Sequence, residues 1–313
     1  MKAVQINQYG GIDVLEINQD TPEPITSGKQ ILVEVFAASI NPIDYKIRSG
    51  NLRKFMPIQF PATLGGDFAG RIIKLGKDVF EFKVGDEVSG SAIVLNEGSG
   101  AFAEKLAANT ENIAIKPSST DFLQAAALPL VGSSTIQALE EHIKLQSGQK
   151  ILIHGGAGGI GSMAIQLAKA IGAYVTTTVN TDYISFVEKL GVDEIIDYKK
   201  QAFEQILEDF DAVFDTVGGE VTDKSFEVLK KGGIIVSMLG QPNPELAQKS
   251  NVTAIGQSTH INTKHLNRLR ELVDSGKLKT QVDKVFDLDQ IKEAFTYQEE
   301  SHPKGKVVIR IKD

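Results

Sequence analysis

The sequence has no cysteine among its 313 residues. Disulfide bonds, thiolate nucleophiles and cysteine-based zinc sites are therefore excluded. No apolar run approaches the roughly 20 residues needed to cross a bilayer. The first residues, MKAVQINQYGG, lack the basic and apolar regions of a signal peptide. We therefore expect a cytoplasmic protein.

Positive charge is also scarce. The chain has 33 Lys and Arg against 40 Asp and Glu, a net charge of -7. A nucleic-acid surface needs clustered Lys and Arg to neutralise phosphates, so nucleic acid is not an expected partner. Hydrophobic residues make up 42% and charged residues 23% of the chain, as in soluble globular proteins. The expected partners are small molecules, with no nucleic acid and no membrane.

The pattern of the sequence changes near residue 120, and its length suggests about two domains. Residues 1–120 contain short strands punctuated by Gly and Pro, which predicts a β-rich domain. Residues 121–260 begin with a helical pattern broken at Pro129 and continue with β-branched strands that alternate with helices. This alternation predicts an α/β fold with a doubly wound parallel sheet. Residues 261–313 add a helix and a final strand.

The stretch KILIHGGAGGIGSMAIQLAKAIGA joins an apolar strand to a helix, predicted over residues 159–171, through a glycine-rich loop. Its glycines fit G-x-G-x-x-G, whose members form a tight turn, admit a pyrophosphate and let helix pack on strand. The helix N-terminus offers free N–H groups to phosphates. The pattern alone is weak, because such turns also occur where a helix packs closely on a sheet, but the βαβ context favours dinucleotide binding. The candidate residues are Gly156, Ala157, Gly158, Gly159, Ile160 and Gly161.

The choice of dinucleotide is made near the end of the next strand, where an acidic residue would hold a ribose 2′-hydroxyl. The strand YVTTTV ends instead in Asn180 and Thr181, whose neutral groups tolerate a 2′-phosphate. Asp182 complicates this interpretation, because a shift of the loop would bring its carboxylate to the ribose. Tyr183 and Tyr198 are the nearest candidate phosphate partners. We therefore predict NADP(H) as the cofactor.

Several ordered motifs can be compared with known families. They are AASINPIDYKIRSG (37–50), LGGDFAGRIIKLG (64–76), FKVGDEVSG (82–90), the glycine loop, FDTVGG (214–219) and HPKGKVVIRI (302–311). Together they resemble the medium-chain dehydrogenase/reductase superfamily over essentially the whole chain, and within it the zinc-independent quinone oxidoreductases and alkenal or enone reductases. The resemblance implies a GroES-like catalytic domain in residues 1–120 and 261–313, with a Rossmann domain inserted between them. It also implies an NADPH-dependent oxidoreductase and a possible homodimer.

Zinc-dependent members of the superfamily place a Cys three residues before an Asp, and a His-Glu pair in a Gly-His-Glu motif. Here Asn41 precedes Asp44, and Gly66 and Asp67 replace the His-Glu pair. None of the three positions keeps its usual ligand type. No two of the five histidines have the i, i+4 spacing of a helical metal pair, and packing or surface roles are expected for them. We expect no metal.

Without a metal to stabilise an alkoxide, alcohol oxidation is the poorer hypothesis. Conjugate reduction needs less stabilisation of charge than alcohol oxidation does. Hydride adds to the β-carbon of an activated alkene, and fixed hydrogen-bond donors stabilise the charge that develops on the carbonyl oxygen. Quinones accept hydride for the same reason. The alternative function is a non-catalytic NADP(H)-binding redox sensor or structural protein.

The candidate catalytic residues lie in NPIDYKIRSG, which resembles the family's active-site segment. Asn41 is expected to donate to the carbonyl or contact the nicotinamide ribose, with a turn before Pro42 as the alternative. Asp44 either orients its neighbours or caps the helix that follows. Lys46 supplies a cation to the developing enolate, or is solvated surface. Tyr45 and Arg48 are expected to be packing and surface residues.

Further cofactor contacts are implied by the resemblance. Ser134 and Thr135 lie in a segment similar to the family's cofactor-contacting turn, although either can be the N-cap of a helix through Leu139. In open parallel sheets, ligands bind at the carboxyl ends of the strands. Four more candidate residues lie at such strand ends. These are Val217, Gly218, Leu239 and Gly240.

Overall fold

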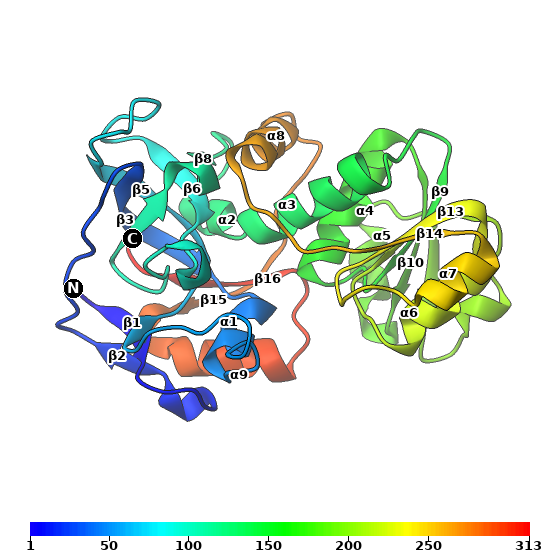
Figure 1. Cartoon of the computed structure of the whole chain (residues 1–313). Helices are drawn as coiled ribbons and strands as arrows, with labels where there is room; N and C mark the ends of the chain where they lie inside the picture. Colours follow the sequence, from blue (N-terminus) through cyan, green and yellow to red (C-terminus); the bar gives the residue numbers. More distant parts are fainter. The chain divides into compact units, whose positions relative to one another are not determined.

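The chain leaves its first structural unit after Leu130 and returns to it at Ile261. In the computed structural model, which describes all 313 residues, unit 1 comprises residues 1–130, 261–274 and 280–313, and unit 2 comprises residues 131–260 and 275–279 (Figure 1). The first boundary lies beyond residue 120 because helix α2 (Phe122–Ala126) buries its alanines against strands of unit 1. Both chain termini belong to unit 1, so unit 2 is an insertion.

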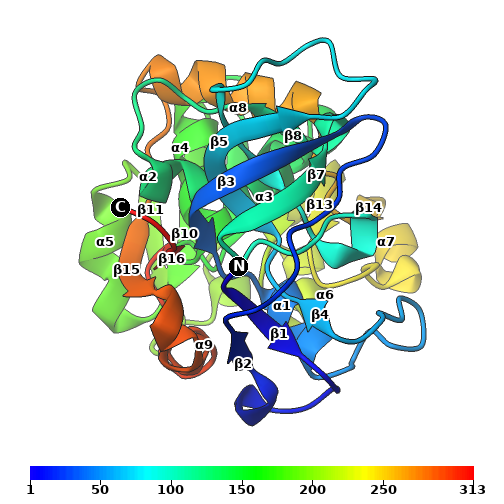
Figure 2. The ribbon, with the colours of Figure 1, turned by 90° about the vertical axis from the view of Figure 1, so that its left-hand side faces the viewer.

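Unit 1 contains two sheets. The smaller has the strand order β2-β1-β4, and the larger has the order β15-β16-β3-β5-β6-β8, with β7 also paired to β3. Figure 2 shows β3 and β5 side by side. The strands are β1 (Ala3–Ile6), β2 (Glu16–Asn18), β3 (Gln30–Ser39), β4 (Ala62–Thr63), β5 (Asp67–Leu75), β6 (Glu87–Ser91), β7 (Lys105–Asn109), β8 (Ile113–Ile115), β15 (Val282–Asp287) and β16 (Lys306–Arg310). The helices besides α2 are α1 (Pro42–Arg48), α8 (Thr263–Asp274) and α9 (Ile291–Glu300).

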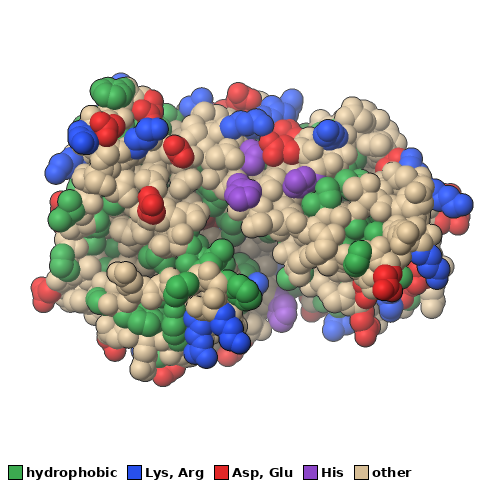
Figure 3. All heavy atoms as spheres, viewed as in Figure 1, with side chains coloured by type: hydrophobic (Ala, Val, Ile, Leu, Met, Phe, Trp, Pro, Cys, Tyr) green, Lys and Arg blue, Asp and Glu red, His purple; other side chains and the backbone are tan.

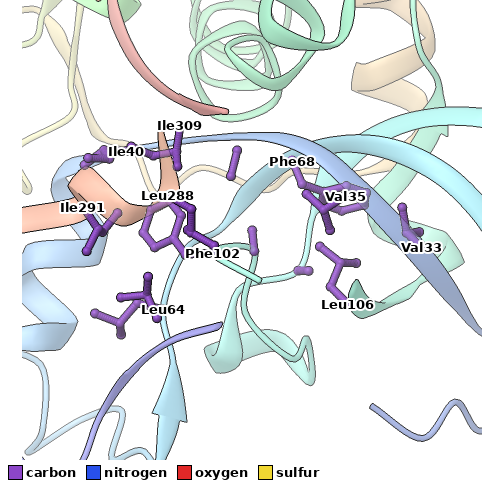
Figure 4. Packing of buried hydrophobic residues seen from close by; sticks show 14 of the residues in the cluster. Val33, Val35, Ile40, Leu64, Phe68, Phe102, Leu106, Leu288, Ile291 and Ile309 are labelled. Atoms are coloured by element: carbon purple, nitrogen blue, oxygen red, sulfur yellow. The ribbon is translucent and has the colours of Figure 1, made fainter. Parts of the chain in front are cut away.

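The core of unit 1 is built from both ends of the sequence. Strand β16 pairs antiparallel with β3, with Ile309 opposite Ala38. Phe102 and Phe295, both fully buried, meet edge to face with ring centroids 5.9 Å apart. Figure 4 shows Ile40 and Ile309 close together in this cluster, with Phe102 nearby. The residues before and after the insertion therefore share one hydrophobic core, as the predicted GroES-like domain requires.

Unit 2 is a six-stranded, all-parallel sheet with the order β11-β10-β9-β12-β13-β14. The order reverses at β9, which is the arrangement of a doubly wound Rossmann fold. The strands are β9 (Lys150–His154), β10 (Tyr174–Val179), β11 (Glu194–Asp197), β12 (Phe210–Asp215), β13 (Leu229–Ser237) and β14 (Thr253–Gly256). The helices are α3 (Pro129–Ile136), α4 (Gly159–Ile171), α5 (Ile184–Glu188), α6 (Glu220–Lys224) and α7 (Pro244–Ser250).

Local sequence explains where the helices of unit 2 begin and end. Helix α4 has the predicted bounds: Gly158 is its N-cap, and Gly172, with φ +96°, ends it in the left-handed conformation that glycine adopts readily. The predicted break at Pro129 is the first residue of α3, where the missing N–H of proline is not needed. The α3 segment continues as a π-helix over Gln137–His142, which the helical pattern did not predict.

Candidate functional site

The glycine loop follows β9 and opens α4, as predicted. A Cβ on Gly156 would lie 2.1 Å from the Thr177 hydroxyl oxygen, and one on Gly161 would lie 2.2 Å from the carbonyl oxygen of Gly155. Real Cβ atoms do not approach other atoms so closely. These two glycines are therefore required by the close packing of strand, loop and helix.

Gly158 differs from its neighbours because the protein itself has room for a side chain there. A Cβ at this position would meet only the Gly155 carbonyl oxygen, at 3.5 Å, which is an ordinary contact. Its φ of -73° is also open to any residue. A bare backbone here, at the N-terminus of α4, fits the close approach of a pyrophosphate to the N–H groups of Gly159, Ile160 and Gly161. Ala157, buried between the glycines, completes the loop.

The ends of β12 and β13 lie beside this loop. A Cβ on Gly155 would approach the Val217 side chain to 3.3 Å, and one on Gly218 would lie 2.7 Å from Leu239. Val217 and Leu239 are each 50% exposed, which is high for apolar residues at strand ends. Gly240, with φ +119°, follows them. The predicted strand-end residues therefore form one half-exposed apolar wall next to the glycine loop.

A buried carboxylate fixes the turn that carries Val217. Asp215 accepts hydrogen bonds from the N–H groups of Val217 at 2.9 Å and Gly218 at 3.0 Å, and from the hydroxyls of Thr222 and Ser237. Four donors satisfy the carboxylate without a partner of opposite charge. Asp215 therefore positions the wall, a role that the motif FDTVGG alone did not assign to it.

The end of β10 carries the predicted selectivity residues. The Asn180 side chain accepts a hydrogen bond from the N–H of Asp182, and the Thr181 hydroxyl donates to Asp197 at 2.6 Å. Tyr183 lies in the short helical turn that follows, half-buried. Asn180 therefore shapes this turn through its own side chain.

Strand pairing brings a cation to this turn that the sequence pattern missed. Val179 is paired with Asp197 in parallel register, so the residues after β11 lie beside Asn180. Tyr198 is exposed, and the Lys199 ammonium lies 5.4 Å from its ring centroid. Lys200, by contrast, forms an ion pair with Asp197 at 3.0 Å. A Tyr-Lys pair next to a neutral Asn suits a phosphate.

Ser134 and Thr135 do not cap a helix. Both lie inside α3 and are buried, so the N-cap alternative is wrong. The Ser134 hydroxyl is 2.7 Å from that of Thr259, and the Thr135 hydroxyl contacts the Ile160 carbonyl oxygen at 3.5 Å. Residues 257–260 are held against α3, where the Gln257 side chain donates to the Ser134 carbonyl oxygen at 2.9 Å. Thr135 thus reaches the start of α4, and Ser134 secures a neighbouring loop.

In unit 1 the candidate catalytic segment is helix α1 with its cap. Asn41 is the N-cap and Asp44 the N3 residue of a reciprocal capping box, with the Asn41 N–H donating to the Asp44 carboxylate at 2.7 Å. The structural role considered for Asp44 is therefore present. The second Asp44 oxygen, Oδ1, is buried without a hydrogen-bond partner.

The Asn41 side chain is engaged at both ends. Its Nδ2 donates to Asp67 at 2.9 Å, and its Oδ1 accepts from the Lys306 ammonium. The Lys306 ammonium also donates to the Ile40 carbonyl oxygen at 2.6 Å. Asn41 is 2% exposed, and Asp44, Asp67 and Lys306 are buried. Asn41, Asp44, Asp67 and Lys306 are called the buried ionic cluster below.

Burial shifts every titratable group of this cluster toward its neutral form. It raises the pKa of Asp44 to about 7, raises the pKa of Asp67 and lowers the pKa of Lys306, while the attraction between Lys306 and the two carboxylates opposes these shifts. Two carboxylates share one ammonium, so the second carboxylate lacks a counter-ion. Asp44 is accordingly the group that holds a proton near neutral pH.

The rest of α1 divides into buried and accessible side chains. Arg48 is not a surface residue: it is buried, and its guanidinium forms two hydrogen bonds with Glu299 of α9, at 2.7 and 3.1 Å. Tyr45 packs against the core of unit 1. Lys46 is half-buried, and its ammonium makes no hydrogen bond or ion pair. Lys46 is therefore the cation of α1 that is available to a ligand.

The positions to which the resemblance assigns zinc ligands in zinc-dependent enzymes hold a different chemistry here. Asn41 and Asp67 face the Lys306 ammonium, and Gly66 has no side chain. No group of three or more His, Asp or Glu side chains is arranged to hold a metal ion. Of the histidines, His154 is buried between the hydroxyls of Thr178 and Ser225, where burial lowers its pKa to about 4.

Two protein families match separate parts of the chain. The GroES-like domain of alcohol dehydrogenases matches residues 27–118, and the zinc-binding dehydrogenases match residues 190–309. With the inserted Rossmann sheet and its glycine loop, these matches define the class: the chain belongs to the medium-chain dehydrogenase/reductase superfamily and is an oxidoreductase.

Similar proteins identify the branch. The NADPH-dependent alkenal/one oxidoreductase of Arabidopsis thaliana, a chloroplastic protein, is 36% identical over 99% of this chain and 79% of its own length. The quinone oxidoreductase of Coxiella burnetii has a TM-score of 0.92 and 37% identity, with 100% of this chain and 99% of that one covered. The Escherichia coli quinone oxidoreductase complexed with NADPH has a TM-score of 0.88 and 26% identity, with 99% and 100% covered. The chain belongs to the zinc-independent quinone and alkenal/one oxidoreductase branch.

No helix is long and apolar enough to span a membrane. The cytoplasmic location and the homodimer stay predictions.

The glycine loop yields a first test. Gly158→Ala should leave the melting temperature nearly unchanged and weaken dinucleotide binding at least tenfold, because only the ligand needs the space. Gly161→Ala should lower the melting temperature, because its Cβ would clash with backbone. Thermal unfolding and cofactor titration of both variants check this. Unchanged dinucleotide affinity in Gly158→Ala would contradict the assignment.

The buried ionic cluster yields a second test, through pH. Asp44 keeps its proton more firmly in the folded protein, where its pKa is about 7, than in the unfolded chain, where it is 3.8. Its contribution to stability is therefore complete at low pH and is lost as pH rises through about 7. Relative to Asp44→Asn, the unmodified protein should lose about 2 kcal/mol of unfolding free energy between about pH 5 and about pH 8.

Urea unfolding of both proteins at several pH values measures this difference. Asp67→Asn is the comparison variant, because it removes the counter-ion of Lys306 and should be destabilised throughout that range. Parallel stability curves for Asp44→Asn and the unmodified protein would show that Asp44 is ionised when buried.

Proposed function

We propose that the protein is an NADPH-dependent, zinc-independent reductase of quinones or α,β-unsaturated carbonyl compounds. The observation that carries the proposal is the buried ionic cluster, in which Asn41 and Asp67, at positions where the resemblance places zinc ligands, interact with the Lys306 ammonium instead. The cluster contains no set of metal ligands, and the unpaired Lys46 ammonium further along α1 supplies a hydrogen-bond donor. Conjugate reduction needs only such donors, because the charge on the carbonyl oxygen is delocalised as an enolate.

Bound NADPH supplies the hydride. The glycine loop would hold the pyrophosphate, the wall of Val217 and Leu239 would pack against apolar faces of the cofactor, and Thr135 supports the start of α4. Asn180, Thr181, Tyr183, Tyr198 and Lys199 would surround the 2′-phosphate. The neutral Asn180 tolerates this phosphate, and Lys199 adds a positive charge next to it.

Within unit 1, Lys46 is the stronger candidate for the contact with the carbonyl oxygen. Its ammonium has no partner within the protein, whereas the Asn41 amide is bonded to Asp67 and Lys306 and is almost fully buried. Asn41 and Asp44 would then act by fixing the first turn of α1, and so the position of Lys46 one turn further along. This gives the cluster a positioning role.

The reductase proposal is tested by NADPH oxidation with a panel of enones, alkenals and quinones. Turnover with at least one class, and faster with NADPH than with NADH, is the expected result. NADPH binding without turnover on any acceptor would overturn the proposal and favour the redox sensor or structural protein.

Lys46→Met should lower kcat with an α,β-unsaturated ketone about 30-fold, equivalent to about 2 kcal/mol, because the cation interacts most strongly once charge has developed on the oxygen. NADPH affinity should change little, since the phosphates are held by unit 2. Steady-state kinetics and cofactor titration separate the two effects. Lys83→Met, at an exposed lysine of unit 1, is the control. A kcat within about twofold of the unmodified enzyme would remove Lys46 from the mechanism.

Lys199→Gln should weaken NADPH binding about tenfold and leave NADH binding unchanged, because only NADPH carries the 2′-phosphate. Lys200→Gln is the matched control, since the Lys200 ammonium is already paired with Asp197. Dissociation constants for both cofactors check the prediction. Equal losses for NADPH and NADH in Lys199→Gln would assign Lys199 to the fold of the turn.

A further inference from the structure

The loop between α1 and β4 exposes large apolar side chains that have no role among the candidate site residues described above. Phe55 is 85% exposed, Met56 is 51% exposed and Phe60 is 39% exposed. Figure 2 shows this loop projecting from the ribbon beside β4. Residues 53–60 are called the 53–60 loop below. Single exposed hydrophobic residues are common, but three within six residues form a patch that needs an explanation.

The same loop is positively charged in an acidic protein. Between Asp44 and Asp67 the sequence has four basic residues and no acidic one, whereas the whole chain has a net charge of -7. Arg48 is buried against Glu299, but Arg53 and Lys54 are exposed and form no ion pair. In Figure 3, basic and hydrophobic side chains lie together over α1 and the loop that follows it. The patch therefore combines apolar tips with uncompensated cations.

The 53–60 loop is held in this exposed arrangement by unit 1. The Ile58 N–H donates to the Tyr9 hydroxyl at 3.3 Å, and the Phe60 ring meets the Tyr9 ring edge to face at 4.9 Å. The N–H groups of Phe55 and Met56 both donate to the Leu52 carbonyl oxygen, at 3.0 and 2.8 Å. The side chains at the tip are therefore displayed without a pocket of their own to fold into.

We propose that the 53–60 loop docks the protein reversibly on an anionic lipid surface. Phe55 and Met56 would enter the interface between headgroups and acyl chains, and Arg53 and Lys54 would face the anionic headgroups. A projecting tip needs no complementary pocket in a fluid lipid surface, and the charge of the loop is complementary to anionic lipid. Binding is peripheral, because no helix is able to span a membrane. The proposal is independent of the reaction catalysed in the reductase site.

Unit 1 has another exposed aromatic side chain, Phe80, but it is not surrounded by an excess of positive charge. Phe80 is 86% exposed, as much as Phe55, but its neighbours are mixed in charge, with Asp78 and Glu81 beside Lys77 and Lys83. The Phe80 N–H donates to the Glu81 carboxylate at 3.0 Å. These neighbours have no net positive charge that would attract an anionic surface, so Phe80 is a matched control for exposure without positive charge.

The experiment is co-sedimentation of the full chain with phosphatidylcholine vesicles, with or without about one third phosphatidylserine. The unmodified protein should bind the phosphatidylserine vesicles at least tenfold more strongly than pure phosphatidylcholine, and binding should fall as salt is added. The double variants F55S/M56S and R53Q/K54Q should each reduce binding to phosphatidylserine vesicles about tenfold. Phe80→Ser should bind like the unmodified protein. All four substituted side chains of the loop are exposed, and far-ultraviolet circular dichroism verifies the fold.

Two outcomes would overturn the proposal. The first is equal binding of the unmodified protein to both vesicle types, or no binding to either, and the second is an equal loss in Phe80→Ser. If vesicle binding is absent and an oligomer dissociates in F55S/M56S on sedimentation velocity, a second copy of the chain covers the loop instead. NADPH turnover measured in the same samples keeps the result separate from the proposed function, because none of the four substituted residues is a candidate for the cofactor or the carbonyl contact.

Discussion

The ammonium group of Lys306 is buried where three segments far apart in the sequence meet. It donates to the Ile40 carbonyl oxygen and the Asn41 amide, and it attracts the carboxylates of Asp67 and Asp44. A buried charge is costly unless it is paired and hydrogen-bonded, so these groups must be assembled together or not at all. Their assembly joins β16 to the end of β3, to β5 and to the first turn of α1. The position of the proposed catalytic helix follows from this one interaction.

Unit 2 also contains a buried carboxylate, which is satisfied by hydrogen-bond donors and not by a cation. Asp215 has no cation, but four donors satisfy it and fix the turn that carries Val217. The close packing of Gly161 against the Gly155 carbonyl group also fixes the glycine loop. Between these constraints, Gly158 keeps a bare backbone and Val217 and Leu239 keep half their surface exposed. The rigid parts serve packing, and the parts left open fit a ligand.

The sequence alone determined the features that depend on neighbouring residues. The alternation of buried strands and helices predicted the parallel sheet, and the glycine spacing predicted helix α4 with its bounds, because caps and periodicity are local properties of the chain. The capping box of Asn41 and Asp44 is local too, and it was considered for Asp44. The absence of cysteine excluded whole classes of chemistry before any fold was known.

Tertiary structure decided which polar side chains are available and which are consumed. Asn41 was the first candidate for contact with the carbonyl oxygen, yet strand pairing across some 265 residues of sequence gives its amide to Lys306 and leaves Lys46 unpaired. Lys199 became a candidate for the 2′-phosphate only through the register of β10 with β11. Arg48, expected at the surface, is buried by its pairing with Glu299 of α9. Local patterns cannot encode such partners, because a buried charge or amide is satisfied by whichever group the fold brings to it, regardless of sequence separation.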